Sequence, residues 1–309
     1  MDYTVATDLV TFHHPAFWGK GTNAELRSWL DGHLDQFWST VLTTLVSTGV
    51  KGLELTFSPG SINDVAKCFG SGLAFKSELD RRGLRVVSAF IADGPKWDTT
   101  TDLAVVVADA QRRATFLREV GAEILVASLP MRRTFGAKPP LFVDHTFMAR
   151  MADIAHVVGE AVSELGLKLA VHTESNSTLW YERDIDLFMV MTDPCYVWLC
   201  PDSCHISLGG GDPVRVAQKH NQRIILAHWK DASGPITENL VIDQTIYEQQ
   251  QRYMVNFGSG VVDWRGWAAA MKRTPGKDIA LIELDAASDP IGQLGAGTQL
   301  VANALNDRL

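Results

Sequence analysis

The stretch from Thr146 to Glu174, TFMARMADIAHVVGEAVSELGLKLAVHTE, contains the repeating unit of this chain. Apolar residues recur every three or four positions up to Leu165, which is typical of an amphipathic helix. Gly166 follows, as expected of a residue that ends a helix in the left-handed conformation. The next run, Lys168–His172, is short and almost wholly apolar, which indicates a parallel strand buried on both faces.

The same unit recurs along the 309 residues, so eight strands are expected. We place them at Thr4–Phe12, Gly52–Phe57, Arg85–Ile91, Ile124–Ser128, Lys168–His172, Tyr196–Cys200, Arg223–His228 and Ile279–Leu284. We place helices at Leu34–Ser47, Ile62–Arg82, Asp102–Val120, Thr146–Leu165, Asp184–Met191, Pro213–His220, Asp263–Arg273 and Gln299–Asn306. This pattern predicts an α/β fold, a single (β/α)₈ barrel over residues 1–309. A doubly wound open sheet is the alternative, but neither GxGxxG nor GxxxxGK[ST] is present to support it.

Composition and charge exclude several classes of protein. Lys and Arg total 28 against 36 Asp and Glu, and a net charge of −8 argues against nucleic acid or an anionic membrane as partner. No apolar run approaches the roughly 18 residues of a membrane span, and Met1–Thr4 does not resemble the start of a secretory signal. Four cysteines are too few for a disulfide scaffold, so we expect a cytoplasmic protein.

Two long irregular segments, at about residues 131–144 and 231–260, each follow an expected strand. In a barrel of this kind they lie on the C-terminal face, where active sites are built. We therefore expect loop insertions there that either shape the pocket or are tolerated surface additions.

Four consecutive expected strands end in residues that bind metal ions. They are Glu174, Asp202, His228 and Glu283. Three carboxylates converging on one rim repel one another, and a divalent cation removes that repulsion. Oxygen and imidazole ligands suit Mn²⁺, Mg²⁺ or Co²⁺, and Zn²⁺ less specifically. The sequence predicts one divalent ion, with Mn²⁺ preferred; a surface charge or helix cap is the alternative for any one of the four.

Several residues at the same strand ends are candidates for moving a proton. His172 and Glu174 are two positions apart, so both point the same way from an extended strand. His172, Glu174, His205 and Glu283 are candidate bases for removing a proton next to a carbonyl group. Lys230 follows His228 by two residues and is expected either to hold a substrate oxygen or to pair with its neighbour Asp231 at the surface.

Aromatic and basic residues beyond the strand ends are candidates for contacting a substrate. We select His13, His14, Trp18, Trp97, Trp180 and Arg132. Such side chains stack on sugar rings or aryl groups and bind anions, although packed loops and exposed arginines are the common alternatives. Glu54, inside the second expected strand, is expected to be buried and hydrogen-bonded rather than catalytic.

Short motifs in the second half resemble those of one superfamily. Asp202-x-x-His205, Gly209–Pro213 and His228–Asp231 resemble the "DxxH…GGxDP…HxKD" run of the sugar isomerase/epimerase-like, or xylose isomerase-like, TIM barrels. Gly258–Asp263 and Ile282–Asp285 resemble the "GxGxvD…vELD" ending of its inosose dehydratase-like branch. The resemblance covers about residues 167–290 and extends to the first half only in strand rhythm and in a short GLEL motif.

The resemblance implies a metal site of Glu, Asp, His and Glu from the fifth to eighth strands. Asp202, His228 and Glu283 fall on matching motifs, whereas many members have Glu where this chain has His172. We expect Glu174 to bind the metal and His172 to face the substrate, with the reverse assignment, or both as ligands, left open. The resemblance also implies a homo-oligomer, or a hetero-oligomer with a smaller subunit, because relatives that cleave 3-oxo-glycosides, including C-glycosides, carry such a subunit.

These features predict a metal-dependent enzyme that enolises a polyhydroxylated keto-sugar or keto-cyclitol. Reprotonation of the enolate gives isomerisation or epimerisation, and loss of a β-substituent makes the enzyme a lyase, as in inosose dehydration or 3-oxo-C-glycoside cleavage. One alternative is a metal phosphodiesterase resembling endonuclease IV, which the net charge of −8 disfavours. Another is a non-catalytic sugar-binding barrel, which does not require three converging carboxylates.

Overall fold

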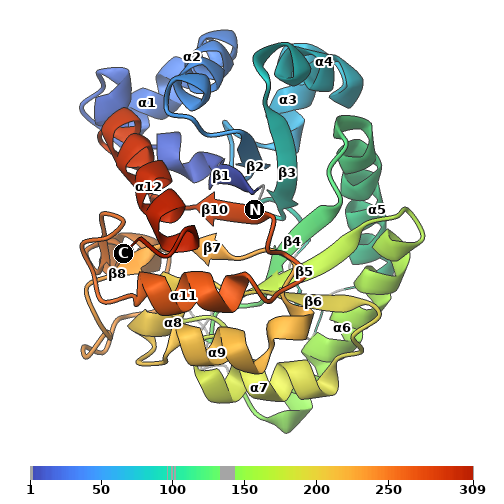
Figure 1. Ribbon diagram of the computed structural model, residues 1–309. Coiled ribbons are helices and arrows are strands. Elements are labelled where there is room, and N and C mark those ends of the chain that lie inside the picture. Colours follow the sequence, from blue (N-terminus) through green and yellow to red (C-terminus); the bar gives the residue numbers. More distant parts are fainter. Residues whose placement is uncertain (1–2, 96, 99, 101, 133–142, 309) are drawn as a thin grey trace.

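The computed structural model describes residues 3–308, except residues 96, 99, 101 and 133–142 (Figure 1). Within them, eight parallel strands form one sheet in the order β6-β5-β4-β3-β2-β1-β10-β7. The strands are β1 Thr4–Asp8, β2 Gly52–Leu55, β3 Arg85–Phe90, β4 Ile124–Ser128, β5 Lys168–His172, β6 Val197–Cys200, β7 His228–Trp229 and β10 Ile279–Ile282. Isolated parallel bridges, Leu199 with Ile224 and Asp202 with His228, link the two edge strands and nearly close the sheet. The predicted (β/α)₈ barrel is confirmed.

Helices surround the sheet (Figure 1). The α-helices are α1 Asn23–Leu30, α2 Leu34–Ser47, α3 Ile62–Phe69, α4 Gly72–Arg82, α5 Leu103–Val120, α6 His145–Ser163, α7 Glu182–Met191, α8 Ser203–Leu208, α9 Pro213–Lys219, α10 Ile246–Gln251, α11 Trp264–Met271 and α12 Pro290–Leu305. Short 3₁₀ helices cover Leu9–Phe12, Pro15–Trp18 and Asn221–Arg223. The main apolar core lies between these helices and the sheet, and a second cluster that includes Ala6, Val126 and Leu281 lies inside the barrel.

The expected helix Ile62–Arg82 is wrong, because the structure has two helices there. Gly70 ends α3 at φ 80°, a conformation that glycine adopts without strain. The hydroxyl of Ser71 then accepts a hydrogen bond from the amide of Ala74 and so begins α4. A glycine that ends a helix therefore lies next to a serine that begins one. The sequence prediction overlooked this pair because the apolar spacing continues across it.

Three expected elements have different bounds in the structure. The strand expected at Thr4–Phe12 ends at Asp8, because the Asp8 carboxylate accepts from the amide of Val10 at 2.6 Å and turns the chain into a 3₁₀ helix. The seventh strand is only His228–Trp229 rather than Arg223–His228. The last helix begins at Pro290, nine residues before the expected start at Gln299, with Asp289 as its cap.

The segment 231–260 is folded and stands beside the C-terminal end of the barrel. It contains the antiparallel pair β8 Asp231–Ala232 and β9 Met254–Val255, as well as α10. The buried Asp231 carboxylate accepts from the amides of Gly258 and Gly260, both at 2.9 Å, and from the Trp264 indole at 3.2 Å. One carboxylate therefore fixes the far end of this segment. Most of the segment expected at 131–144 lies outside the described residues.

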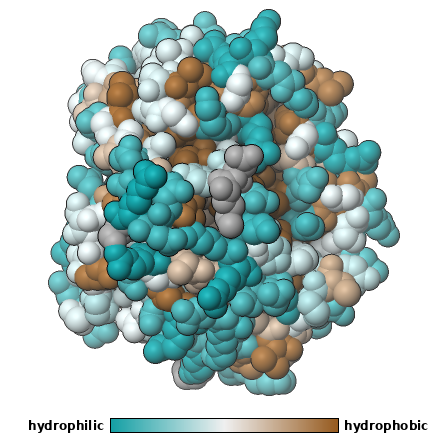
Figure 2. All heavy atoms as spheres, viewed as in Figure 1, coloured by the Kyte–Doolittle hydropathy of each residue, from teal (hydrophilic) through white to brown (hydrophobic). Residues whose placement is uncertain are grey.

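The surface visible in Figure 2 is mainly hydrophilic, with apolar residues scattered among polar ones. Among the described residues, no helix is long and apolar enough to span a bilayer.

Candidate metal centre

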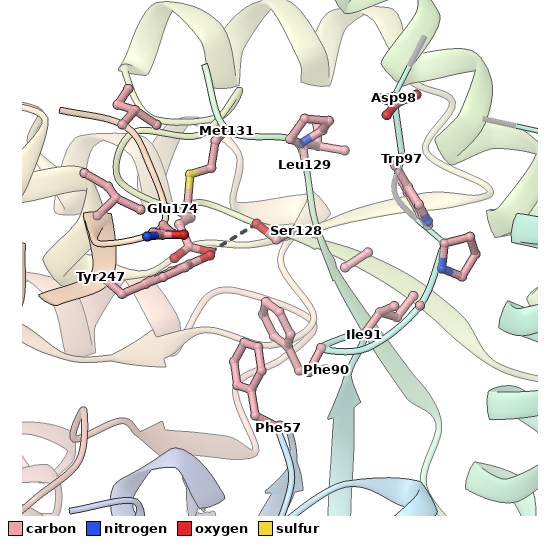
Figure 3. Close-up of a pocket in the computed structure, with 18 of the residues that line it drawn as sticks. Phe57, Phe90, Ile91, Trp97, Asp98, Ser128, Leu129, Met131, Glu174 and Tyr247 are labelled. Carbon is pink, nitrogen blue, oxygen red and sulfur yellow. Dashed lines mark hydrogen bonds between the residues drawn. The ribbon is translucent and has the colours of Figure 1, made fainter. Parts of the chain in front are cut away.

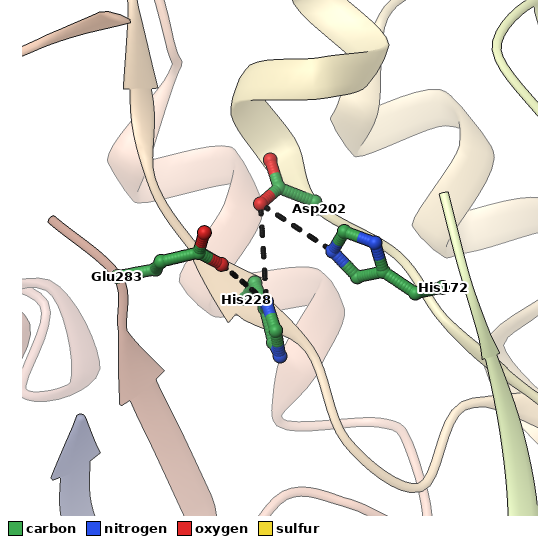
Figure 4. A group of neighbouring side chains, drawn as sticks. All are labelled: His172, Asp202, His228 and Glu283. Carbon is green, nitrogen blue, oxygen red and sulfur yellow. Dashed lines mark hydrogen bonds and ion pairs between the residues drawn. The ribbon is translucent and has the colours of Figure 1, made fainter. Parts of the chain in front are cut away.

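Four buried side chains from the last four barrel strands face one another at the C-terminal rim (Figure 4). His172 ends β5, Asp202 follows β6, His228 begins β7 and Glu283 follows β10. Each offers one ligand atom, and these atoms all lie within 4.8 Å of one another. Asp202 Oδ2 lies 3.7 Å from His172 Nε2 and 4.0 Å from His228 Nδ1, while Glu283 Oε2 lies 2.5 Å from His228 Nδ1.

The hydrogen bonding of this group fits a bound cation. Both ring nitrogens of His172 and the Oδ2 atom of Asp202 are buried without a hydrogen-bond partner. Oδ1 of Asp202 is already used, because it accepts from the amide of His205 at 2.8 Å. Buried polar atoms without partners are costly, and two buried carboxylates beside two imidazoles form a ligand set for one divalent ion. The group is therefore a candidate site for one divalent metal.

Glu54 stands behind the His228 ring. Its Oε1 lies 3.0 Å from His228 Nε2, and its Oε2 accepts from the Ser88 hydroxyl at 2.6 Å. Burial opposes ionisation of Glu54, but His228 outweighs it and lowers the pKa of the carboxyl. A carboxylate that holds the outer nitrogen of a metal-facing histidine orients the ring. Sequence reasoning missed this role; the signal is a lone glutamate within the otherwise apolar GLEL strand.

Lys230 carries a buried positive charge beside the four residues. Its Nζ lies 2.9 Å from Glu283 Oε1 and 2.6 Å from Asp285 Oδ2. Burial disfavours the ammonium, but Asp285 and Glu283 outweigh it and raise the pKa of Lys230 well above its usual value. Burial raises the pKa of Asp285 to about 6. Lys230 is thus buried and paired with acidic groups, unlike the surface lysine considered as its alternative.

A chain of buried hydrogen bonds links His205 to α10. The Ser175 hydroxyl donates to Gln250 Oε1 at 2.9 Å and lies 2.8 Å from His205 Nδ1. Since that hydroxyl proton is used, Nδ1 of His205 donates to Ser175 and Nε2 keeps a lone pair. Nε2 lies 3.4 Å from Lys230 Nζ, and burial lowers the pKa of His205 to about 3. His205 is therefore a neutral imidazole at the pocket wall, and its Nε2 lone pair accepts from the Lys230 ammonium.

Glu174 lies outside the group of four, in which His172 takes the place that we expected Glu174 to occupy. Strand β5 ends at His172, and the amide of Thr173 makes the last hydrogen bond to β6, by donating to the carbonyl of Cys200. Glu174 follows beyond that point, in the loop after the strand. Its Oε2 lies 4.0 Å from His172 Nδ1 and accepts from the Ser128 hydroxyl at 3.1 Å. Burial raises the pKa of Glu174.

A cavity of about 300 Å³, here called the metal pocket, opens over the group of four. His172, Glu174, His205, His228, Lys230 and Glu283 all line it. Tyr247, Gln250 and Gln251 of α10 line it from the segment 231–260. The proton-moving candidates chosen from the sequence are therefore gathered in one pocket.

The six residues expected to contact a substrate do not share one location. Trp97 is buried and lines a second cavity next to the metal pocket. His13 and His14 line a polar groove of about 750 Å³ that also reaches Asp285. Burial lowers the pKa of His13 to about 4, and His14 Nδ1 caps a 3₁₀ helix by accepting from an amide.

The side chains of Trp18, Trp180 and Arg132 pack against aromatic rings, and Arg132 also forms an ion pair. The Trp18 indole donates to the carbonyl of Phe12 at 2.7 Å and stacks on Phe37. Trp180 stacks on Tyr181. Arg132 pairs with the buried Asp184 and lies over the Tyr181 ring. Among the described residues, none of these three lines the metal pocket.

Comparison with known proteins agrees with this fold. A family model described as "Xylose isomerase-like TIM barrel" matches residues 42–304, and the chain belongs to this family. An inosose dehydratase of Bacillus licheniformis is 25% identical over 237 residues, covering 73% of each chain. An inosose dehydratase of Lacticaseibacillus casei is 29% identical over 164 residues, but that match spans only 50% of this chain and 53% of the relative.

Solved structures share the fold at low identity. A probable 3-DHS dehydratase, AsbF, from Bacillus anthracis superposes with a TM-score of 0.70 at 13% identity, covering 98% of this chain and 99% of that chain. An L-ribulose 3-epimerase gives a TM-score of 0.69 at 14% identity, over 100% and 96% of the chains. The IOLI protein, solved with a zinc atom, gives 0.68 at 12% identity, over 99% of both.

Proposed function

We propose that this protein is a divalent-metal-dependent lyase that removes a proton next to the carbonyl of a keto-cyclitol or oxidised sugar and then expels a β-substituent. The observation that carries the proposal is the composition of the metal pocket. It combines a four-residue metal group with a carboxylate outside that group, Glu174, and with a neutral imidazole, His205. A Lewis acid, a carboxylate base and a polar group that orients the substrate, placed side by side, suit enolisation.

The bound ion supplies Lewis-acid polarisation of the substrate carbonyl. Glu174 removes the α proton, because its carboxylate lines the pocket and only Ser128 is hydrogen-bonded to it among the described side chains. The Lys230 ammonium holds negative charge that develops on a substrate oxygen, and the neutral His205 imidazole, which accepts from that ammonium, helps to position it. The expelled β-substituent takes a proton from the protonated Glu174, which restores the carboxylate.

The first half of this reaction is common to isomerases, epimerases and lyases. Return of the proton to a carbon gives epimerisation or isomerisation, whereas loss of water or another β-substituent gives an unsaturated ketone. The inosose dehydratase relatives support elimination. Cleavage of a 3-oxo-C-glycoside is the corresponding elimination with a carbon leaving group.

We propose Mn²⁺ as the resident ion. Two carboxylates favour a hard cation and two imidazoles favour a transition metal, and Mn²⁺ accepts both ligand types. Co²⁺ and Zn²⁺ fit the imidazoles as well, whereas Mg²⁺ rarely takes two of them. Elemental analysis of the protein after purification without chelators identifies the ion.

The test is proton exchange with solvent. The protein is incubated in D₂O with Mn²⁺ and a panel of inososes, 3-oxo-sugars and ketoses, and mass spectrometry follows deuterium uptake and loss of water. We expect uptake with at least one ketone, its loss after chelation, and its slowing by Glu174→Gln. The variant His220→Ala, which removes a largely buried pairing with Asp186 away from the metal pocket, is the matched control. Failure of every ketone in the Mn²⁺-loaded protein would overturn the proposal.

A further inference from the structure

A tyrosine on helix α10 stands beside the candidate base of the metal pocket. Tyr247 lines that pocket, and Figure 3 shows its ring reaching toward the Glu174 carboxylate. Glu174 raises the pKa of Tyr247 more than burial or Asp285 does, and a carboxylate has so strong an effect only at short range. The phenol and the carboxylate are therefore neighbours at the C-terminal rim, although they are far apart in the chain.

Helix α10 is held in register with the loop that carries Glu174. Gln250 is buried and lies three residues after Tyr247 on that helix. Its Oε1 accepts from the Ser175 hydroxyl at 2.9 Å and from the Asn176 side-chain amide at 3.0 Å. Residues three apart on a helix are neighbours on one face, and Ser175 directly follows Glu174. The hydrogen bonds of Gln250 therefore fix the place at which Tyr247 meets Glu174.

The Tyr247 hydroxyl is available to a substrate. Among the described residues, none is hydrogen-bonded to it. The Glu174 carboxylate and burial both disfavour a phenolate, and so they raise the pKa of Tyr247 above its usual value. The phenol therefore keeps its proton near neutral pH, and its hydroxyl is a hydrogen-bond donor at the pocket wall.

The other groups of the wall that carry a proton are poorer donors to a leaving group. Burial opposes the Lys230 ammonium, but its pairing with Asp285 and Glu283 raises its pKa and so makes it a weak acid. His205 is neutral, and its Nδ1 proton is used in the hydrogen-bond chain to α10. Thr56 has the other uncharged hydroxyl among the described side chains that line the pocket, and an alcohol is a weaker acid than a phenol.

We infer that Tyr247 is a further catalytic residue, which gives a proton to the departing β-substituent and takes one back from Glu174. In this step the bond between the β carbon and the leaving oxygen breaks, and the electron pair left at the α carbon forms a carbon–carbon double bond. The leaving oxygen takes the phenol proton, and the Tyr247 oxygen takes the α proton that Glu174 holds. Both side chains end the step in their starting forms. This inference deepens the proposed function and rests on it for removal of the α proton by Glu174.

The first experiment separates the two halves of the reaction. Each Mn²⁺-loaded protein is incubated in D₂O with an inosose, which loses water, and with methyl 3-oxo-glucoside, which loses methanol. Mass spectrometry follows deuterium at the α carbon and loss of the β-substituent. We expect Tyr247→Phe to slow the loss of water and methanol by about 10²-fold or more, as removal of a proton donor does, while deuterium uptake continues. Glu174→Gln should lose both.

The matched control is Tyr253→Phe. The Tyr253 hydroxyl accepts from Arg252, and Tyr253 is not among the described residues that line the metal pocket. We expect this variant to retain both deuterium uptake and loss of the β-substituent. Tyr247→Leu is a second variant without the hydroxyl, and it takes the place of Tyr247→Phe if melting curves show that the latter does not fold.

The second experiment varies the leaving group. 4-Nitrophenoxide departs as an anion and requires no proton, whereas methoxide requires one. We therefore expect Tyr247→Phe to slow cleavage of methyl 3-oxo-glucoside strongly and cleavage of the 4-nitrophenyl compound little. Equal slowing of the two would mean that Tyr247 only shapes the pocket, and it would overturn the inference.

The remaining outcomes are decisive as well. Loss of water and methanol at the parent rate in Tyr247→Phe would overturn the inference and leave the proposed function intact. Deuterium uptake by the parent without loss of a β-substituent from any ketone would also overturn the inference, because no departing group then needs a proton. Absence of uptake with every ketone would overturn the proposed function and, with it, the role of Tyr247.

Discussion

Oε1 of Glu54 lies 3.0 Å from Nε2 of His228, so a buried carboxylate in β2 pairs with the imidazole that β7 contributes to the candidate metal site. Ser88 in β3 fixes the other oxygen of Glu54. Three strands that are not all neighbours in the sheet therefore set the orientation of one ring.

Glu54→Gln should weaken metal binding by roughly 10–100-fold, the usual effect of losing such a supporting carboxylate. The amide keeps the size of the side chain but loses the negative charge that favours Nε2–H. The dissociation constant for Mn²⁺ checks this. Glu123→Gln, an exposed change, is the control. An unaltered dissociation constant in Glu54→Gln would mean that the carboxylate does not act through His228.

His172→Ala and Glu174→Gln should separate the two roles at the end of β5. We expect His172→Ala to lose metal occupancy, because His172 Nε2 lies 3.7 Å from the unpartnered Asp202 oxygen. We expect Glu174→Gln to retain the ion but to slow deuterium exchange by about 10²-fold or more, as loss of a catalytic base does. Elemental analysis of both variants distinguishes them. Metal loss in Glu174→Gln alone would assign the ligand role to Glu174.

Gln250→Leu should change the tautomer of His205. The amide oxygen of Gln250 accepts the Ser175 proton, and without it that hydroxyl is free to donate to Nδ1 of the imidazole. We expect ¹⁵N NMR of His205 to show a partial shift of the proton to Nε2, and the rate of exchange to fall with little change in metal content. Gln249→Leu on the same helix, which contacts Val241 and Thr245 instead, is the matched control. An unchanged His205 spectrum in Gln250→Leu would refute the relay.

Asp231→Asn should destabilise the protein by about 2–4 kcal/mol, because a buried charged acceptor is replaced by a group that turns N–H toward the donors of Gly258 and Gly260. Urea unfolding monitored by tryptophan fluorescence measures the change. The exposed replacement Asp307→Asn, which breaks only a surface pairing with Lys272, should cost less than about 1 kcal/mol. Equal effects of the two changes would show that the Asp231 contacts add nothing.

Removal of the ion by a chelator should lower the melting temperature, because a ligand that binds only the folded state stabilises it. Mn²⁺ added back should restore the temperature in a concentration-dependent way. Asp202→Asn, which lacks one of the buried carboxylates, should show a smaller response. A melting temperature that is independent of Mn²⁺ would argue against a resident ion.

The fold could be predicted because its determinants are local. The helix 145–163, Gly166 and the strand 168–172 are each specified by a few adjacent residues, and the unit repeats. The break at Gly70 was missed because the apolar spacing runs through it without interruption.

The candidate metal site could be predicted only in part, because the end of a strand fixes where a residue lies but not where its side chain points. Asp202, His228 and Glu283 follow from their places at successive strand ends. The choice between His172 and Glu174 depends on where β5 stops pairing, which is set by contacts with β6 rather than by the local sequence. The Glu54 support and the Gln250 relay join residues far apart in the chain, and no local pattern specifies them.

The two edge strands of the sheet, β6 and β7, meet at the bridge between Asp202 and His228. There the amide of His228 donates to the carbonyl of Pro201 at 3.0 Å. Asp202 and His228 also hold two corners of the candidate metal site. A cation bound by both residues would hold the first and last strands of the sheet together from inside the barrel. Metal binding and closure of the barrel would then be coupled. Amide hydrogen exchange at His228 should report both.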